Sequence, residues 1–339
     1  MRILRPYLQE AHKQESPYHG NCNLMRAIKE KYDYEEVVFP PEMDEEEKAE
    51  IIRQYDVLLT CWQSPHVPNS LAENPGNLKY ICNITGEMRR WIDPELVASP
   101  KLVVTNWGDA PAYGVAEGAF ALLMATLKEI PVFVRSAREN GFGIPEGIRL
   151  GSLYGTKIGI FGMGVIGRKF VEFLRPFEPR IYAYDPFVTQ MPEGVTRMDT
   201  LEELFDVAQI MVIHAGLTEQ TRGIVTGDLL SRLPDGGIII NTARGAIIER
   251  EALEKEILSG RLRGGLDVLA PKDMPEVDSP LRTSENCVLS AHHISGTYWG
   301  VDPEMLTFTD RNCLDNLARF EAGEPLKFVM TPERYALST

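Results

Sequence analysis

Residues 157–185 read KIGIFGMGVIGRKFVEFLRPFEPRIYAYD, and this stretch decides the fold of the chain. The run Lys157–Phe161 is apolar and carries β-branched residues at alternate positions, which predicts a buried strand. A G-x-G-x-x-G turn follows at 162–167, and the apolar spacing after it predicts a helix. A second strand-like run ends at Asp185. Strand, glycine turn, helix, strand and acid in this order predict a dinucleotide-binding βαβ unit.

Each glycine of the turn has a separate role in such a unit. Gly162 permits the tight turn, Gly164 lets the backbone approach a pyrophosphate, and Gly167 lets the helix pack closely on the strand. The unpaired N–H groups of the first helical turn favour a bound phosphate. Asp185 can accept hydrogen bonds from an adenosine ribose and would repel a 2′-phosphate, so we expect NAD rather than NADP as the cofactor.

Length, charge and cysteine content narrow the class of protein. The 339 residues suffice for about two domains. A net charge of −14 argues against a nucleic-acid surface and against binding to an anionic membrane. The N-terminus lacks the apolar segment of a secretory signal, and no apolar run is long enough to span a membrane. Five scattered cysteines without a C-x-x-C fit a reducing compartment and give no zinc signature. We therefore expect a cytoplasmic protein without a metal site.

Strands alternate with helical patterns on both sides of the βαβ unit. This rhythm predicts parallel sheets covered by helices on both faces. The segment 112–127 is apolar on most faces and predicts a buried helix, and the turn signal at 109–111 marks a crossover between domains. Asp44, with Glu47 three residues later, predicts the start of a helix.

Polar residues recur where the later strands are predicted to end. His214, Arg244, Asp267 and His293 each lie on or just past the end of an apolar run. In a doubly wound sheet, ligands bind beyond the carboxyl ends of the strands. We therefore expect these four side chains to lie along one edge of a sheet.

Together these segments resemble the D-isomer-specific 2-hydroxyacid dehydrogenases, a family that includes phosphoglycerate dehydrogenases and glyoxylate and hydroxypyruvate reductases. The matching blocks are GMGVIGR, IHAGLTEQTRGIV, LPDGGIIINTARGAIIEREAL, SGRLRGGLDV and HISG, and the resemblance covers roughly residues 80–330. It implies an α/β fold with two doubly wound parallel-sheet domains and a cleft between them. A Rossmann NAD-binding domain would span 109–297, and a flavodoxin-like substrate domain would combine 1–108 with 298–339. It also implies a homodimer formed through the NAD-binding domain.

The resemblance also assigns cofactor contacts residue by residue. Backbone N–H groups of Val165 and Ile166 would bind the pyrophosphate, and Asp185 would bind the adenosine ribose. The remaining expected cofactor contacts, on the adenine side and around the nicotinamide, are Ala215, Gly216, Thr221, Thr242, Ala243 and Asp267.

Two catalytic side chains are implied by the same comparison. Arg244 matches the arginine that grips the carboxylate and the carbonyl oxygen of the substrate, a bidentate task that suits its planar guanidinium. The general acid/base should be a histidine, because its proton is exchanged near neutral pH. The family pattern Pro-His-Ile-x-Gly selects His293, whereas counting from Asn286 selects His292; we favour His293.

The sequence departs from the family at two places. Most relatives pair the histidine with a glutamate, but here Lys272 stands at that position, followed by Asp273. Three interpretations are open: Asp273 replaces the glutamate, Lys272 binds an anionic group of the substrate, or catalysis is impaired. The expected substrate loop is Gly86, Glu87 and Met88, whose backbone N–H groups would hold the substrate carboxylate. A glutamate there would repel a carboxylate unless its side chain turns away.

We therefore expect an NAD-dependent oxidoreductase that transfers a hydride between nicotinamide and C2 of a small D-2-hydroxy or 2-oxo acid. Arg244 would orient the acid and His293 would move the proton. One alternative is an NAD(H)-sensing binding protein without catalysis, like the corepressors that resemble this family. Another is formate oxidation, suggested by the HISG match, although relatives of that type carry glutamine at the position of Lys272.

Overall fold

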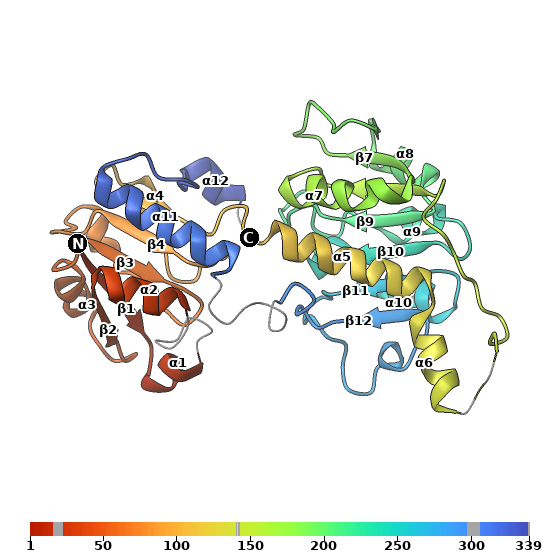
Figure 1. The fold of residues 1–339 in the computed structure, drawn as a ribbon, viewed down its shortest axis with the longest axis horizontal. Helices are drawn as coiled ribbons and strands as arrows, with labels where there is room; N and C mark the ends of the chain where they lie inside the picture. The colour runs from red at the N-terminus through yellow and green to blue at the C-terminus, as the bar shows by residue number, and fades with distance from the viewer. Residues whose placement is uncertain (16–22, 140, 142, 297–305, 338–339) are drawn as a thin grey trace. The chain divides into compact units, whose positions relative to one another are not determined.

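The computed structural model describes residues 1–15, 23–139, 141, 143–296 and 306–337. The chain divides into two compact units, Met1–Pro111 with the described part of Tyr298–Thr339, and Ala112–Thr297. The predicted crossover at 109–111 lies at this division. Each unit contains one parallel sheet with helices on both faces, as Figure 1 shows, which confirms the predicted α/β class.

The sheet of the first unit has the strand order β2-β1-β3-β4-β5. This is the order of flavodoxin-like doubly wound folds. Successive side chains of each strand face opposite sides of the sheet, so the strands contribute to two apolar cores. The strands are β1 (Arg2–Tyr7), β2 (Asp33–Val38), β3 (Val57–Thr60), β4 (Tyr80–Asn83) and β5 (Val103–Thr105).

Helices cover both faces of this sheet. Its helices are α1 (Glu10–Glu15), α2 (Asn23–Lys31), α3 (Glu45–Ile52), α4 (Pro94–Ala98), α11 (Phe308–Ala322) and α12 (Pro332–Leu337). Buried residues of α2 and α11 pack in one core, and those of α3, α4 and α12 pack in the other. α11, which follows the second unit in sequence, lies beside α2 (Figure 1). Asp44 caps α3 in a capping box with Glu47, as predicted.

The second unit contains a seven-stranded parallel sheet in the order β12-β11-β10-β9-β6-β7-β8. From β6, the strand order runs through β7 and β8 toward one edge of the sheet and through β9 to β12 toward the other. This is the Rossmann arrangement, in which the ligand binds at the switch point between β6 and β9. The strands are β6 (Lys157–Phe161), β7 (Arg180–Tyr184), β8 (Val195–Arg197), β9 (Ile210–Ile213), β10 (Ile238–Asn241), β11 (Arg263–Leu266) and β12 (Cys287–Leu289).

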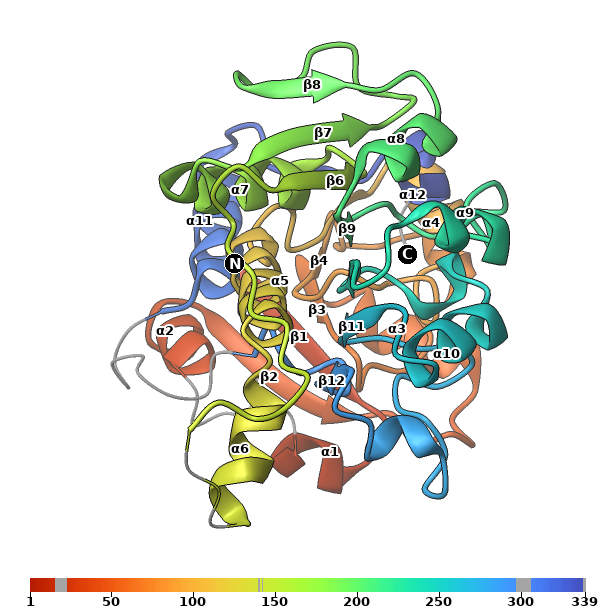
Figure 2. The same cartoon turned by 90° about the vertical axis from the view of Figure 1, so that its right-hand side faces the viewer.

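Two groups of helices flank the seven-stranded sheet. Figure 2 shows α5 (Ala112–Leu127) and α7 (Val165–Leu174) on one side of it, with α8 (Leu201–Val207), α9 (Gly227–Arg232) and α10 (Arg250–Leu258) on the other. The two groups build separate apolar cores against the two faces of the strands. Helix α5 has the bounds predicted from its apolar sequence.

One helix of the second unit was not predicted. This helix is α6 (Ile130–Arg138), and Pro131 occupies its first turn, where a missing N–H costs nothing. Helix α6 is amphipathic and has no buried residue, and Ile130 and Val134 are 46% and 40% exposed. Among the described residues, no helix combines the length and the apolar character needed to cross a membrane.

Candidate active site

The glycine turn after β6 has three distinct environments. Gly162 has a φ of 97°, and a Cβ there would lie 2.5 Å from the backbone N of Ala215. A Cβ at Gly167 would lie 2.3 Å from the carbonyl oxygen of Gly162. At Gly164, by contrast, a Cβ would meet nothing within 4 Å. The first and third glycines are therefore needed for the chain's own packing, while the second borders open space that a ligand can enter.

Helix α7 begins directly at this open space. Gly164 is its N-cap residue, and Val165 and Ile166 form its first turn. No described residue accepts a hydrogen bond from the backbone N–H groups of Val165 or Ile166. These N–H groups and the positive end of the helix dipole favour a phosphate at this point.

Asp185, at the end of β7, is tied to the glycine turn. Its carboxylate accepts hydrogen bonds from the backbone N of Met163 at 2.8 Å and of Phe187 at 2.9 Å. The N–H of Gly162 also donates to the carbonyl of Tyr184 at 3.0 Å. Asp185 therefore fixes the shape of the turn, a structural role that the sequence comparison did not suggest.

The other predicted cofactor residues follow strands that are neighbours in the sheet. β9, β10, β11 and β12 lie side by side, so the residues past their carboxyl ends share one edge. Ala215, Gly216 and Thr221 belong to the loop after β9, where the Thr221 hydroxyl donates to the Gly216 carbonyl at 2.7 Å. Thr242 and Ala243 follow β10, and Asp267 follows β11. The Thr242 hydroxyl is buried and has no partner among the described residues.

His214 lies at this edge but faces the core. Its two ring nitrogens are buried and have no hydrogen-bond partner within the described ranges. The ring packs edge-on against Phe170 of α7, with centroids 5.1 Å apart. Burial lowers the pKa of His214 to about 3, so this imidazole is neutral and is a poor proton donor at neutral pH.

Arg244 lies in a rigid loop after β10. The Asn241 side chain accepts from the N–H of Ala243 at 3.0 Å and donates to the carbonyl of Arg244 at 3.1 Å. Gly245 has no room for a side chain, because a Cβ would lie 2.0 Å from the carbonyl carbon of Leu269. The half-buried Arg244 guanidinium donates to the Ala243 carbonyl at 2.8 Å. The loop thus presents the guanidinium at the predicted edge.

Asp267 anchors the turn that carries the two histidines. This carboxylate is buried, and one oxygen accepts from the Ser290 hydroxyl at 2.7 Å and from the N–H of Ile294 at 3.2 Å. Its backbone carbonyl accepts from the N–H of His292 at 2.6 Å. Ala291 and His292 have φ values of 54° and 62°, a costly conformation for non-glycine residues that these bonds hold in place.

The two candidate histidines have different partners. Nδ1 of His292 lies 2.9 Å from a carboxylate oxygen of Asp273, and both side chains are 45% exposed. His293 is exposed, and within the described part of the chain its side chain has no hydrogen bond. Lys272 is also exposed and makes no hydrogen bond or ion pair with a described residue. The carboxylate partner therefore belongs to His292, not to the residue that the family pattern favoured.

The predicted substrate loop lies in the first unit and depends on one side chain. Asn83, the last residue of β4, donates to the carbonyls of Thr85 at 2.7 Å and of Glu87 at 2.9 Å. Its amide oxygen accepts from the Thr60 hydroxyl at 2.9 Å and from the indole N–H of Trp91 at 3.0 Å. Asn83 therefore links the ends of β3 and β4 and the turn at Trp91 to the loop, and sequence reasoning missed it because a buried asparagine carries no motif.

The loop itself presents backbone rather than side chains. No acceptor among the described residues pairs with the N–H groups of Gly86, Glu87 or Met88. The Met88 side chain is fully buried, and the Glu87 carboxylate turns toward Arg90, whose Nε lies 3.0 Å away. The Trp107 indole packs on Gly86, where a Cβ would lie 2.4 Å from Nε1. Ion pairing with Arg90 reduces the repulsion that Glu87 would exert on a bound carboxylate.

Comparisons with known proteins agree with these features. The family model for the D-isomer specific 2-hydroxyacid dehydrogenase, NAD binding domain, matches residues 120–293. The chain is 30% identical over 277 residues to a D-3-phosphoglycerate dehydrogenase of Methanocaldococcus jannaschii, covering 80% of this chain but only 52% of that protein. It is 32% identical over 254 residues to a hydroxypyruvate reductase of Thermotoga maritima, covering 74% of this chain and 81% of that protein.

A solved structure shares the whole fold. An acyclic imino acid reductase in complex with NADPH and D-Arg superposes with a TM-score of 0.75 at 24% identity, covering 96% of this chain and 99% of that one. This likeness extends the shared fold to both units. The resemblance inferred from the sequence is confirmed, and the chain belongs to the D-isomer specific 2-hydroxyacid dehydrogenase family of NAD(P)-binding oxidoreductases.

Proposed function

We propose that this protein is an NAD-dependent D-2-hydroxyacid dehydrogenase or 2-oxoacid reductase. A bound nicotinamide dinucleotide would supply or accept the hydride at C2 of the acid. The observation that carries the proposal is the edge formed by β9 to β12, where Arg244, Asp267 and a histidine–carboxylate pair follow adjacent strands. These groups provide an anion-binding cation and a proton relay beside a glycine turn suited to a dinucleotide.

Three features support the fit of a dinucleotide. The space beside Gly164 accepts a pyrophosphate, and the N–H groups of the first turn of α7 have no described partner. The buried Thr242 hydroxyl has no hydrogen-bond partner among the described residues, and a bound ligand could supply one. The Asp185 carboxylate favours NAD, because it would repel the 2′-phosphate of NADP. The imino acid reductase of similar fold binds NADPH, so cofactor preference is part of the proposal.

For the substrate we propose two anion-binding elements. Arg244 would hold the carboxylate and carbonyl oxygen through paired N–H groups, polarising the C2 carbonyl for hydride attack. The loop of Gly86, Glu87 and Met88 would bind a carboxylate through its three backbone N–H groups, which no described acceptor occupies. Each element by itself suits a carboxylate, the group that 2-oxo and 2-hydroxy acids share.

For the proton relay we propose His292 with Asp273, in place of the sequence-based preference for His293. The carboxylate at 2.9 Å orients the ring, which would donate a proton to the substrate oxygen during reduction. Asp273 would thus replace the family's glutamate, which is one of the three interpretations of the Lys272 substitution. The exposed Lys272 then needs no role in the reaction.

The experiment is NADH consumption with a panel of 2-oxo acids, including glyoxylate, hydroxypyruvate and larger aromatic acids. We expect turnover of at least one acid, with His292→Asn and Asp273→Asn lowering kcat while NADH affinity stays unchanged. His293→Asn is the matched control and should retain activity. Loss of activity in His293→Asn alone would return the relay to His293. Tight NADH binding without turnover of any acid would favour the non-catalytic sensor.

We also propose a homodimer formed through the second unit. The apolar residues Ile130 and Val134 on the amphipathic helix α6 are exposed. An exposed apolar helix face favours association with a second copy of the chain. Val134→Glu should shift the mass measured by light scattering to that of a monomer, whereas Arg138→Glu on the same helix should not.

A further inference from the structure

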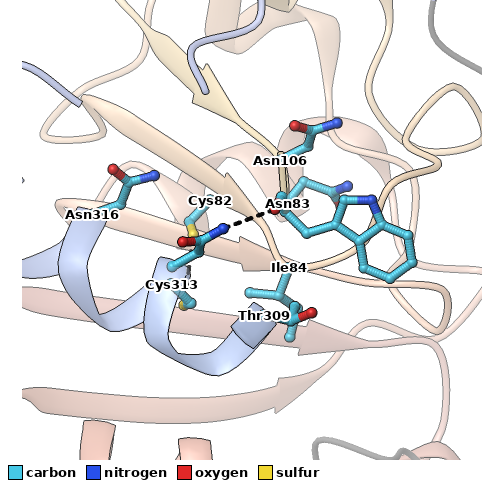
Figure 3. Close-up of a pocket in the computed structure, with 9 residues that line it drawn as sticks. Cys82, Asn83, Ile84, Asn106, Thr309, Cys313 and Asn316 are labelled. Carbon is cyan, nitrogen blue, oxygen red and sulfur yellow. Dashed lines mark hydrogen bonds between the residues drawn. The ribbon is translucent and has the colours of Figure 1, made fainter. Parts of the chain in front are cut away.

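Two cysteines from distant parts of the sequence meet inside the first unit. Cys82 lies in β4 and Cys313 in α11, separated by 231 residues, and their Sγ atoms are 3.7 Å apart. Both side chains are buried. Figure 3 shows Cys82 on the strand and Cys313 on the neighbouring helix. A disulfide bond needs an S–S distance of about 2.05 Å, so a small approach of α11 and β4 would suffice.

Cys82 has an unusually polar environment for a buried thiol. The hydrogen bond between the two thiols, together with the Tyr80 and Thr105 hydroxyls, lowers the pKa of Cys82. The same contact raises the pKa of Cys313 well above its ordinary value. Cys82 is therefore the better nucleophile of the pair, and Cys313 is placed to react with it second.

Cys287 provides a contrast within the same chain. It is also buried, but burial raises its pKa to about 12, and none of the described cysteines lies beside it. A buried thiol without hydrogen-bond donors is expected to be inert. The environment of Cys82 therefore differs from that of an ordinary core cysteine.

A small cavity with an apolar exposed surface lies beside the two cysteines. It has a volume of ≈ 10 Å³, and its lining includes the two cysteines, Asn83 and Asn106 (Figure 3). This volume is about that of one water molecule. The cavity is too small for hydrogen peroxide, so the oxidant reaches the thiols only through local opening of the packing around them.

Each cysteine is adjacent in sequence to an asparagine that holds the substrate loop. Asn83 follows Cys82 and donates to the carbonyls of Thr85 and Glu87. Asn312 precedes Cys313 and donates to the carbonyl of Trp107 at 3.0 Å. Trp107 in turn donates its N–H to Thr85 at 3.4 Å and packs its indole on the loop. Movement of either cysteine would therefore disturb hydrogen bonds that hold this loop, through Asn83 next to Cys82 and through Trp107 next to Asn312.

We propose that Cys82 and Cys313 form a reversible disulfide bond on exposure to hydrogen peroxide, and that this bond alters the substrate loop. The Cys82 thiolate attacks one peroxide oxygen, the O–O bond breaks, and the departing hydroxide takes a proton to give water. Cys313 sulfur then attacks the resulting sulfenic acid, and its proton leaves with the displaced hydroxide as a second water. Two thiols lose two electrons in total, and a thiol reductant reverses the change.

The chemical test is peptide mapping without reduction after treatment of the intact protein with hydrogen peroxide. A Cys82–Cys313 link should appear in wild type and in Cys287→Ser, and it should disappear with dithiothreitol. Cys313→Ser should lose the link and leave a sulfenic acid at Cys82 that dimedone traps; Cys313→Ala serves if the serine variant does not fold. Wild-type protein in which either thiol stays reduced, or oxidises further without linking, would overturn the proposal.

Two further readouts test the consequence of the bond. The oxidised protein should have a Tm higher by roughly 5 °C, because the link joins distant segments. If the proposed function holds, the KM for the 2-oxo acid should change by roughly threefold or more while NADH affinity stays unchanged. The KM comparison rests on the proposed function, whereas the peptide map does not. If no 2-oxo acid is turned over, the peptide map still tests whether the disulfide forms. An unchanged KM in fully linked protein would refute the effect on the loop.

Discussion

The carboxyl edges of the two parallel sheets are built on different principles. At the seven-stranded sheet, glycines whose Cβ positions are blocked set the shape of the phosphate turn, and strand-end side chains supply the chemistry. At the five-stranded sheet, one buried side chain, Asn83, shapes a loop that offers only backbone N–H groups. The first design is fixed by steric exclusion and the second by a hydrogen-bond network. The two should therefore respond differently to substitution.

The largest expected effect concerns the side-chain chemistry of the seven-stranded edge. We expect Arg244→Lys to lower kcat/KM for the 2-oxo acid by roughly 10³-fold, because an ammonium cannot form the paired contacts of a guanidinium. NADH affinity, measured by fluorescence titration, should stay within about twofold, since the phosphates bind elsewhere on this edge. A variant that loses NADH affinity and activity in parallel would contradict this division of roles.

The next effect separates the two kinds of glycine in the turn. Gly167→Ala places a Cβ 2.3 Å from the carbonyl of Gly162, and backbone cannot yield easily. We expect it to weaken NADH binding by roughly 100-fold and to lower the Tm by several degrees. Gly164→Ala is the matched variant, because its Cβ meets no protein atom within 4 Å. It should keep the wild-type Tm and lose only affinity.

These environments explain what could be predicted from the sequence. The strand β6 and the helix α5 were predicted with the bounds they have, because burial of an element is seen directly in the apolar pattern of its sequence. Helix α6 was not predicted, because a proline directly after an apolar helix is compatible both with a loop and with the first turn of a new helix. The pairing of Asp273 with His292 depends on a left-handed turn that no local pattern indicates.

The substrate loop was located but its construction was not foreseen. Its position follows from the family resemblance, yet the role of Asn83 comes from contacts with residues on three other segments. The turning of Glu87 toward Arg90 was also left open by the sequence. Many different residues can form a hydrogen-bond network of this kind, so its members cannot be recognised from one sequence.

A smaller effect is expected at the substrate loop itself. Gly86→Ala brings a Cβ to 2.4 Å from Nε1 of Trp107, which must shift the indole or the loop. We expect the KM for the 2-oxo acid to rise roughly tenfold with NADH affinity unchanged. The double variant Gly86→Ala/Trp107→Ala restores the space and should recover part of the loss. Equal KM values in wild type and Gly86→Ala would mean that the loop does not bind the carboxylate.

The last prediction concerns the free energy of unfolding of the second unit at acid pH. His214 has a pKa lowered to about 3 by burial, whereas an unfolded histidine titrates near 6.5. Between these values the unfolded chain binds a proton that the folded chain does not, so stability falls as the pH drops below about 6.5. The loss should approach roughly 1.4 kcal/mol per pH unit. His214→Leu removes the proton-binding site and should flatten this slope in urea unfolding at pH 7, 5 and 4.

The two units provide their own internal comparison in this experiment. Three of the four tryptophans, Trp62, Trp91 and Trp107, belong to the described part of the first unit. With Trp299 replaced by phenylalanine in every variant, tryptophan emission therefore reports the unfolding of this unit, whereas circular dichroism reports helices of both units. In wild type at low pH, the loss of helical signal should precede the change in emission, because His214 destabilises the second unit. In His214→Leu the two transitions should move closer together. Exposed His66 offers the control, since His66→Gln should leave both transitions where they are. Parallel transitions in wild type and His214→Leu would show that the buried imidazole does not govern the acid stability of this unit.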